Sequence, residues 1–250
     1  MAEQRPFGAD ALAALNPEPR CACVLLLDTS GSMGEPVAAT GSNLVHTYQA
    51  DGRYDEAPAT TTIPIQRVNE AIRAFQADLS SDSLAMQRVE VSVITYGGGV
   101  RTLCPFVSAS EFLPPTLAAD GDTPMGAAIL QAIDAVTARK SWYKQNGLHY
   151  YRPWIVCVTD GRPTDTWQLA AQRVREGEKR KEFAFFAFGV DGTDFGTLDQ
   201  IAAVERKPLK LKGHDFRSLF LWLSSSLRTV SNSNPGEQVQ IAVPAGWASL

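Results

Sequence analysis

Short apolar runs that alternate with amphipathic segments constrain the fold of this chain more than any other feature. Residues 21–27 (CACVLLL) and 154–159 (WIVCVT) are apolar almost throughout, and an aspartate follows each of them. Residues 183–190 (FAFFAFGV) form a third run of this kind. Because a strand with two apolar faces must be covered on both sides, such runs are typical of parallel strands between two layers of helices.

The segments between these runs carry the signals of helices and of one hairpin. Residues 63–80 place apolar side chains at helical spacing, which predicts an amphipathic helix. Residues 89–96 are β-branched and alternating, and the glycines at 97–99 predict a hairpin to an edge strand at 100–107. We expect further helices at 124–144, 166–180, 198–204 and 216–230, and a short strand at 209–211. Asp165 is expected to cap the helix that begins at residue 166.

This order of elements predicts an α/β fold. The fold is a three-layer, doubly wound, Rossmann-like sheet that is mostly parallel, with one antiparallel edge strand and helices on both faces. The series is uninterrupted, so we expect one domain over 21–230, preceded by a leader at 1–20 and followed by a tail at 231–250. Two interpretations of the tail stay open. In the first, residues 239–243 pair with a sheet edge and Trp247 fills a surface pocket. In the second, the end of the chain is disordered.

The bulk composition excludes several classes of function. A net charge of −4 gives no overall attraction to nucleic acid or to an anionic membrane, so neither is expected as a partner. No apolar stretch approaches the roughly 20 residues that span a bilayer, and the charged, proline-containing N-terminus does not resemble a signal peptide. We therefore expect a cytoplasmic protein whose four cysteines, Cys21, Cys23, Cys104 and Cys157, are reduced.

Oxygen-bearing side chains stand where two of the apolar runs end. Asp28, Ser30 and Ser32 follow the first run at intervals of two, Asp160 follows the run at 154–159, and Thr123 lies in a loop between them. Parallel strands deliver their carboxyl ends to one edge of the sheet, so these side chains are expected to converge. Carboxylates and hydroxyls without histidine or thiol favour a hard cation, Mg²⁺ first, with Mn²⁺ and Ca²⁺ as alternatives.

The pattern Asp28-x-Ser30-x-Ser32, with Thr123 and Asp160 downstream, resembles the metal-ion-dependent adhesion site (MIDAS) of von Willebrand factor type A (VWA) domains. This resemblance implies that all five residues hold one metal ion. It further implies that the two serines bind the metal directly and that the first aspartate acts largely through water. For the threonine and the second aspartate it implies contacts that shift between direct and water-mediated.

Within this family, the chain is most similar to bacterial cytoplasmic VWA proteins of the tellurite-resistance and stress type. The segments that carry this similarity are GEP, RVNEAI, VEVSVITYGGGV, DTPMGAAI, TDGRPTD and FRSLFLWLSSS. The similarity implies a protein phosphatase and a protein kinase encoded in the same system. An insertion at 37–62 departs from the pattern, and three roles stay open for it: covering the site, contacting a partner, or a neutral surface excursion.

The expected function is non-catalytic. An open position on the metal would accept an Asp or Glu carboxylate from a protein partner, in a bacterial stress-response or defence system. Ser30 and Ser32 lack the flanking glycines of a nucleophile elbow, and His46, His149 and His214 lie in no recognisable motif. Two alternatives stay open: a metal-assisted phosphoester hydrolase, and a VWA scaffold whose metal is purely structural.

Overall fold

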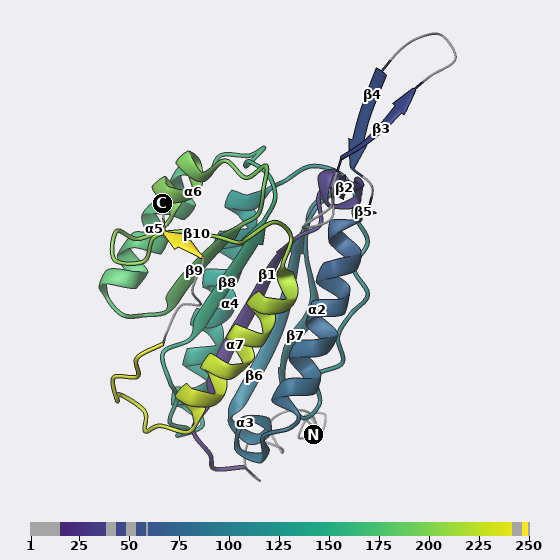
Figure 1. The fold of residues 1–250 in the computed structure, drawn as a ribbon. Coiled ribbons are helices and arrows are strands. Elements are labelled where there is room, and N and C mark those ends of the chain that lie inside the picture. The colour runs from purple at the N-terminus through teal and green to yellow at the C-terminus, as the bar shows by residue number, and fades with distance from the viewer. Residues whose placement is uncertain (1–15, 39–43, 49–53, 59, 242–246, 250) are drawn as a thin grey trace, which may run out of the picture.

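A seven-stranded sheet forms the centre of the computed structural model, which describes residues 16–38, 44–48, 54–58, 60–241 and 247–249 (Figure 1). Its strands are, in spatial order, β11 (Ala248–Ser249), β10 (Leu209–Lys210), β9 (Ala184–Gly189), β8 (Trp154–Thr159), β1 (Cys21–Asp28), β6 (Val89–Tyr96) and β7 (Val100–Ser108). All neighbours from β10 to β6 are parallel, and β7 is the antiparallel edge strand that the hairpin glycines predict. The predicted fold class is confirmed.

Helices cover both faces of this sheet. On one face lie α2 (Pro64–Leu79), α3 (Ser83–Arg88) and α7 (Phe216–Ser231), and on the other lie α4 (Met125–Gln145), α5 (Gln168–Lys179) and α6 (Phe195–Ile201). Strand β1 is buried along its whole length because Leu25 and Leu27 pack into the first layer, whereas Val24 and Leu26 pack into the second. This two-sided burial explains the uninterrupted apolar run in the sequence.

Helix α3 is the one α-helix of the described residues that the apolar spacing did not reveal. Its six residues are too few to show a helical period, but Asp82 caps its start by accepting hydrogen bonds from the backbone N–H groups of Leu84 and Ala85, both at 2.9 Å. An aspartate at the N-cap position was the available signal.

The tail reaches the opposite edge of the sheet. Strand β11 pairs antiparallel with β10, so a second, very short antiparallel strand closes that edge. The ring of Trp247 lies 5.7 Å from that of Phe188 and 5.6 Å from that of Trp222, which agrees with an anchored tail. Residues 239–241 form no strand, and 242–243 lie outside the described residues.

The insertion forms an arm beside the sheet. Strands β2 (Val37–Ala38) and β5 (Thr61–Thr62) pair at its base, and β3 (Leu44–Tyr48) and β4 (Tyr54–Pro58) form an antiparallel hairpin farther out. In Figure 1 this hairpin points away from the body of the molecule. The described part of the insertion is therefore an arm and not a cover folded over the sheet.

The leader is tied to the start of the sheet where it is described. Arg20 forms a parallel bridge with Tyr150, and Glu18 forms an ion pair with Arg88 at 2.6 Å. The rest of the predicted leader, 1–15, lies outside the described residues.

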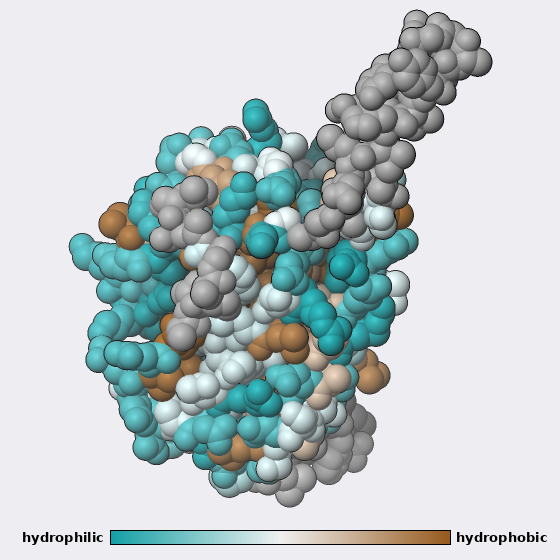
Figure 2. All heavy atoms as spheres, in the orientation of Figure 1, coloured by the Kyte–Doolittle hydropathy of each residue, from teal (hydrophilic) through white to brown (hydrophobic). Residues whose placement is uncertain are grey.

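Hydrophilic residues dominate the face drawn in Figure 2, and hydrophobic ones form small separate patches. Within the described residues, no helix combines the length and apolar character needed to cross a membrane. All four cysteines are free thiols, and Cys21, Cys23 and Cys157 are buried.

Candidate metal centre

The loop after β1 wraps its polar groups around the carboxylate of Asp28. Both the backbone N–H and the hydroxyl of Ser30 donate to Asp28 Oδ1, at 2.9 and 2.6 Å. The chain then turns through a 3₁₀ helix, η1 (Gly31–Gly34), and the hydroxyl of Ser32 lies 3.2 Å from that of Ser30. Asp28 and Ser30 are buried, whereas Ser32 is exposed, so the loop forms a site that opens toward solvent at Ser32.

The second carboxylate comes from the end of β8. Strand β8 lies parallel beside β1 with Val158 opposite Leu27, so the two strand ends meet. The hydroxyl of Ser32 donates to Asp160 Oδ1 at 2.9 Å across this junction. A chain of hydrogen bonds therefore joins four of the five predicted ligands, Asp28, Ser30, Ser32 and Asp160.

Thr159 is a residue of this site that the sequence analysis missed. Its hydroxyl donates to Asp28 Oδ2 at 2.7 Å, so both carboxylate oxygens of Asp28 accept hydrogen bonds from hydroxyl groups. The available signal was its place at the carboxyl end of the run at 154–159: β8 lies parallel beside β1, so a hydroxyl at the end of β8 lies near Asp28 at the end of β1.

Thr123, the fifth predicted ligand, is buried beside the turn that follows Asp160. Its hydroxyl oxygen lies 3.7 Å from the point that a Cβ atom on Gly161 would occupy. Its backbone exchanges two hydrogen bonds with Thr164, in which Thr123 N–H donates to the Thr164 hydroxyl at 3.1 Å and Thr164 N–H donates to the Thr123 carbonyl at 3.0 Å. The structure therefore places Thr123 next to Asp160.

Asp165 does not act as the sequence analysis expected. The predicted helix starts at residue 166, which would make Asp165 its cap, but α5 starts at Gln168. Asp165 instead accepts hydrogen bonds from the backbone N–H groups of Gly126 and Ala127, at 2.9 and 2.8 Å. It thus caps α4, because the start of that helix lies closer in space than the start of α5. This contact fixes the loop that carries Thr123 to the loop that carries Asp160.

Close backbone packing holds in place the loop of residues 120–123, which carries Thr123. Asp120 N–H donates to the Thr29 carbonyl at 2.8 Å, and Gly31 N–H donates to the Gly121 carbonyl at 2.9 Å. A Cβ atom on Gly97 would lie 2.2 Å from the Thr29 carbonyl oxygen, so only glycine fits there. Gly97 therefore serves the site as well as the predicted hairpin.

The carboxylates of Asp28 and Asp160 are both buried. Burial raises the pKa of Asp28 from 3.8 to about 6, against the lowering effect of its hydrogen bonds from Ser30 and Thr159, and burial also raises the pKa of Asp160. Among the described residues, no Lys or Arg forms an ion pair with either aspartate. Buried negative charge is unfavourable until a cation compensates it, so this donor set fits a hard divalent ion.

The site differs from the commonest protein metal centres. No cluster of three or more His, Cys, Asp or Glu side chains is arranged to hold a metal among the described residues. The candidate donors are two carboxylates and three hydroxyls, which is one fewer than the six ligands of an octahedral cation such as Mg²⁺.

His214 is a further residue near the site that no sequence motif indicated. It follows β10, and its imidazole is close enough to Asp160 for each charge to act on the pKa of the other group. Burial is the main cause that lowers the pKa of His214, which favours the neutral imidazole near neutral pH.

Comparisons with solved structures agree with this fold. Proximal thread matrix protein 1 (PTMP1) from the mussel byssus matches with a TM-score of 0.52 and 16% identity, over 85% of this chain and 49% of that one. A second PTMP1 structure, with zinc occupied MIDAS motif, gives 0.51 and 15% over 85% and 49%. The PilB minor pilin from Streptococcus sanguinis gives 0.51 and 13% over 84% and 62%.

The chain spans about half the length of PTMP1. A search of curated proteins gives no match. The family model for the von Willebrand factor type A domain matches residues 55–220, which is more than half of the chain and includes Thr123 and Asp160. The chain belongs to the VWA domain family.

Proposed function

We propose that this protein is a non-catalytic, metal-dependent interaction module. A Mg²⁺ ion held by Asp28, Ser30, Ser32, Thr123 and Asp160 would accept an Asp or Glu carboxylate from a protein partner. The observation that carries the proposal is the pairing of two buried carboxylates, at adjacent strand ends, with hydroxyls and, among the described residues, without an ion pair to Lys or Arg. Such a site is incomplete until a cation binds, and it is open to a guest at Ser32.

The side chains of the site have distinct tasks in this proposal. Bound Mg²⁺ supplies a Lewis-acidic position for one oxygen of the partner's carboxylate. Thr159 orients Asp28 through Oδ2, and the loop contacts of Asp165 hold Thr123 in place. Because the loops are fixed by backbone hydrogen bonds, the donors are arranged before the ion arrives.

The choice of ion and partner is part of the same proposal. PTMP1 with zinc occupied MIDAS motif supports a divalent cation at the equivalent place in this fold, and the oxygen-only donor set favours Mg²⁺ here. We infer a role in a bacterial stress-response or defence system of the tellurite-resistance type, with a co-encoded phosphatase or kinase as the partner. The β3–β4 arm would enlarge the contact surface beside the metal.

Binding measurements with the co-encoded phosphatase and kinase test this function. Affinity is measured by calorimetry in Mg²⁺, in EDTA, and with Asp28→Asn, using Asp134→Asn as a control at an exposed carboxylate on α4. We expect EDTA and Asp28→Asn each to weaken binding at least about tenfold, and the control to leave it unchanged. Equal affinity in all four conditions would overturn the proposal.

The role of the arm separates this function from a scaffold with a purely structural metal. Deletion of residues 38–61 should preserve Mg²⁺ binding, because the arm carries none of the five donors. If the deletion abolishes partner binding while Asp28→Asn does not, the partner grips the arm and the metal is structural.

A metal-assisted phosphoester hydrolase is the second candidate, and the position of His214 favours it. A neutral imidazole near Asp160 would act as a general base that accepts a proton from a water molecule at the site. A turnover screen with phosphoesters in Mg²⁺ or Mn²⁺ tests it, with His214→Asn and Asp160→Ala as variants. Hydrolysis that both variants abolish would establish the enzyme; its absence with every substrate favours the interaction module.

A further inference from the structure

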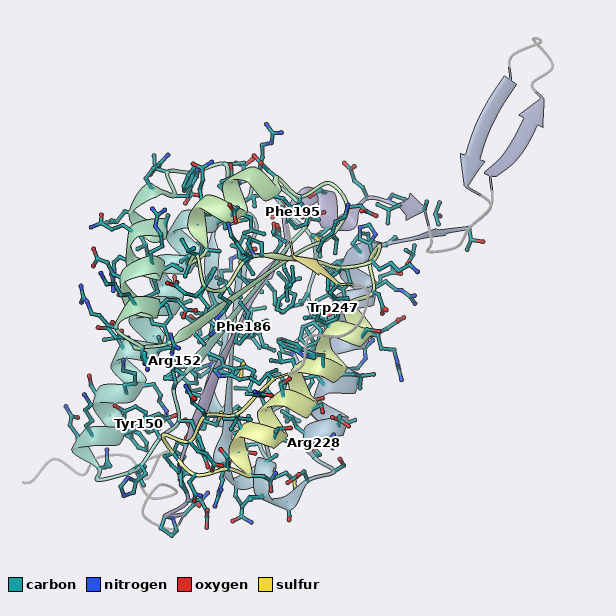
Figure 3. The ribbon with its side chains drawn as sticks, turned by 60° about the vertical axis from the view of Figure 1, so that its left-hand side comes forward. Tyr150, Arg152, Phe186, Phe195, Arg228 and Trp247 are labelled. Atoms are coloured by element: carbon teal, nitrogen blue, oxygen red, sulfur yellow. The ribbon has the colours of Figure 1, made fainter. Side chains whose placement is uncertain are left out.

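A cavity of about 530 Å³ lies at the end of the sheet opposite the candidate metal centre. It opens to solvent and is lined by the first halves of β8 and β9, by the end of α7, and by the C-terminal segment at 236–241. In Figure 3, Arg152 and Phe186 lie on the side of the sheet past which the C-terminal segment runs. The volume falls within the range of small-molecule sites in proteins.

The floor and one wall of this cavity are apolar. The rings of Trp154 and Phe186 pack with their centroids 4.8 Å apart and are 4% and 7% exposed. Val239 and Ile241 of the C-terminal segment pack against the same core and form the facing wall. An occupant must therefore carry an apolar body.

Beside this apolar floor, the cavity carries more cations than carboxylates, and Arg206 lies over the ring of Phe186 with its Cζ 4.4 Å from the ring centroid. Arg152 and Arg206 both bind the buried Glu178, at 2.6 and 2.9 Å, so two guanidinium groups share one carboxylate. Lys181 adds a third cation, and Glu237 adds the second carboxylate. Glu237 also accepts a hydrogen bond from a backbone N–H of its own segment at 3.0 Å. Three cations and two carboxylates leave one positive charge beside the apolar floor.

Lys181 occupies a backbone position that favours glycine. Its φ of 57° is the only positive φ of a non-glycine residue within the described part of the chain. It ends α5, where Lys181 N–H donates to the Glu178 carbonyl at 2.9 Å and Glu182 N–H donates to the Gly177 carbonyl at 2.8 Å. Glycine usually occupies this position in such a hydrogen-bond pattern, because a residue with a side chain is disfavoured at a positive φ. Lys181 stands there despite that cost.

We propose that the cavity binds a small amphipathic carboxylate, which is an apolar chain with one negative charge. The apolar body contacts Trp154, Phe186, Val239 and Ile241, and the carboxylate lies toward Lys181 and the two arginines. A monoanion matches the single excess positive charge of the cavity, and 530 Å³ accommodates a chain of medium length. This site is independent of the metal centre and of its proposed function.

Calorimetric titration of the full chain with octanoate tests the proposal, with octylammonium as a ligand of equal shape and opposite charge. We expect octanoate to bind at one site and octylammonium to bind at least about tenfold more weakly. Lys181→Gln should weaken octanoate binding about twofold to fivefold. Lys179→Gln makes the same charge change two residues away, at a position that does not line the cavity, and should leave binding unchanged.

A second variant separates binding from folding. Lys181→Gly should weaken octanoate binding as Lys181→Gln does, but it should raise the melting temperature because glycine suits the positive φ. Octylammonium that binds as tightly as octanoate, or equal octanoate affinity in the Lys181 and Lys179 variants, would overturn the proposal. Mg²⁺ affinity, measured in parallel, should not differ among these variants, so failure here is distinct from failure of the metal site.

Discussion

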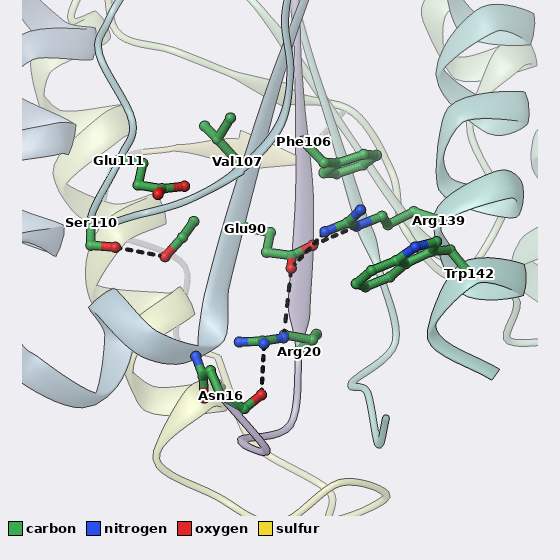
Figure 4. A pocket seen from close by; sticks show the side chains of 10 residues that line it. Asn16, Arg20, Glu90, Phe106, Val107, Ser110, Glu111, Arg139 and Trp142 are labelled. Atoms are coloured by element: carbon green, nitrogen blue, oxygen red, sulfur yellow. Dashed lines mark hydrogen bonds and ion pairs between the residues drawn. The ribbon is translucent and has the colours of Figure 1, made fainter. Parts of the chain in front are cut away.

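The two ends of the sheet bury carboxylates in opposite ways. Near the start of β6, Glu90 accepts two hydrogen bonds from Arg139 at 2.7 and 2.8 Å, accepts another from Tyr143, and lies 3.6 Å from Arg20 (Figure 4). At the other end of the neighbouring strand, Asp28 is equally buried but accepts only from hydroxyl and backbone N–H groups. One carboxylate has guanidinium partners, and the other has none.

This difference separates a structural ion pair from a site that needs an external cation. A buried carboxylate with a bidentate arginine is electrically complete, and its removal leaves unpaired guanidinium groups. A buried carboxylate that is held by neutral donors keeps its charge uncompensated and its geometry ready for an ion. The contrast therefore supports assigning metal binding to Asp28 and Asp160, and a structural role to Glu90.

Glu90→Gln should have the largest effect on stability. The substitution keeps the shape and the hydrogen bond with Tyr143, but it leaves the charges of Arg139 and Arg20 buried without a carboxylate. Breaking a buried ion pair in this way lowers the free energy of unfolding by about 3–5 kcal/mol. Urea unfolding measures the change.

The exposed pair Arg67–Glu70 supplies the control for this prediction. Both side chains are more than half exposed and lie three residues apart on α2. Glu70→Gln should therefore change the free energy of unfolding by less than about 0.5 kcal/mol. Similar losses in the two variants would remove the contrast between the two ends of the sheet.

The metal-free protein should lose stability as the pH rises. Burial raises the pKa of Asp28 from 3.8 to about 6, and it raises the pKa of Asp160 as well. A carboxyl group with a raised folded pKa holds its proton more tightly in the folded state. Its contribution is complete below about pH 4 and is lost as the pH rises through about 6. The shift of Asp28 corresponds to about 3 kcal/mol.

Thermal unfolding in EDTA between pH 4 and 8, compared with Asp28→Asn, isolates this effect. The variant should lack most of the decline and should exceed the wild type in stability at pH 7.5. Saturating Mg²⁺ should stabilise the wild type above pH 6 and leave the variant unchanged. Parallel pH profiles for the two proteins would mean that Asp28 is not an uncompensated buried charge.

Thr159→Val should weaken metal binding without disturbing the fold. The change removes the hydroxyl that donates to Asp28 Oδ2 at 2.7 Å and keeps the volume of the side chain. Loss of a contact that orients a metal ligand lowers affinity by about 10–100-fold. Mg²⁺ titration followed by calorimetry measures it.

Thr193→Val is the matched control, because its hydroxyl donates to the backbone carbonyl of Thr159 at 3.0 Å and touches neither aspartate. It should leave the affinity for Mg²⁺ within about twofold of the wild type. Equal losses in both variants would show that Thr159 acts through the general packing of the loop.

Much of the candidate site was predictable because strand ends are visible in the sequence. The apolar runs locate the ends of β1 and β8, and the rule that parallel strands deliver their carboxyl ends together brings Asp28, Ser30, Ser32 and Asp160 into contact. Their role as metal ligands stays a proposal. The boundaries of α2, α4 and α7 also lie within two residues of the predictions, because their apolar spacing is regular.

The features that the sequence did not predict depend on contacts between residues that are far apart along the chain. Strand β11 has only two residues, too few to show a pattern, and its pairing follows from the anchoring of Trp247. His214 carries no motif and reaches the site only because β10 lies beside β9. The helix that Asp165 caps was misjudged for the same reason, since adjacent positions in sequence favoured α5.

Asp165→Asn should have the smallest effect of this series. An asparagine can accept from only one of the two N–H groups, those of Gly126 and Ala127, that the carboxylate now binds. We expect a loss of about 0.3–1 kcal/mol in unfolding free energy, because asparagine still caps the helix but removes the negative charge at its N-terminus. The loss of Mg²⁺ affinity should be smaller than that of Thr159→Val, because the loop of Thr123 is loosened but no donor is removed.

Asp215→Asn at the N-cap of α7 makes the same change at a helix whose cap contacts only its own first turn. It should reduce stability by a similar amount, since both substitutions weaken one cap, and it should leave Mg²⁺ binding unaltered. If both variants alter Mg²⁺ affinity equally, the effect comes from global stability. If only Asp165→Asn alters the affinity for Mg²⁺, the contact between the two loops is what positions Thr123. The end of the sheet that carries Asp28 is then held together by neutral backbone donors, whereas the end that carries Glu90 is held together by arginine side chains.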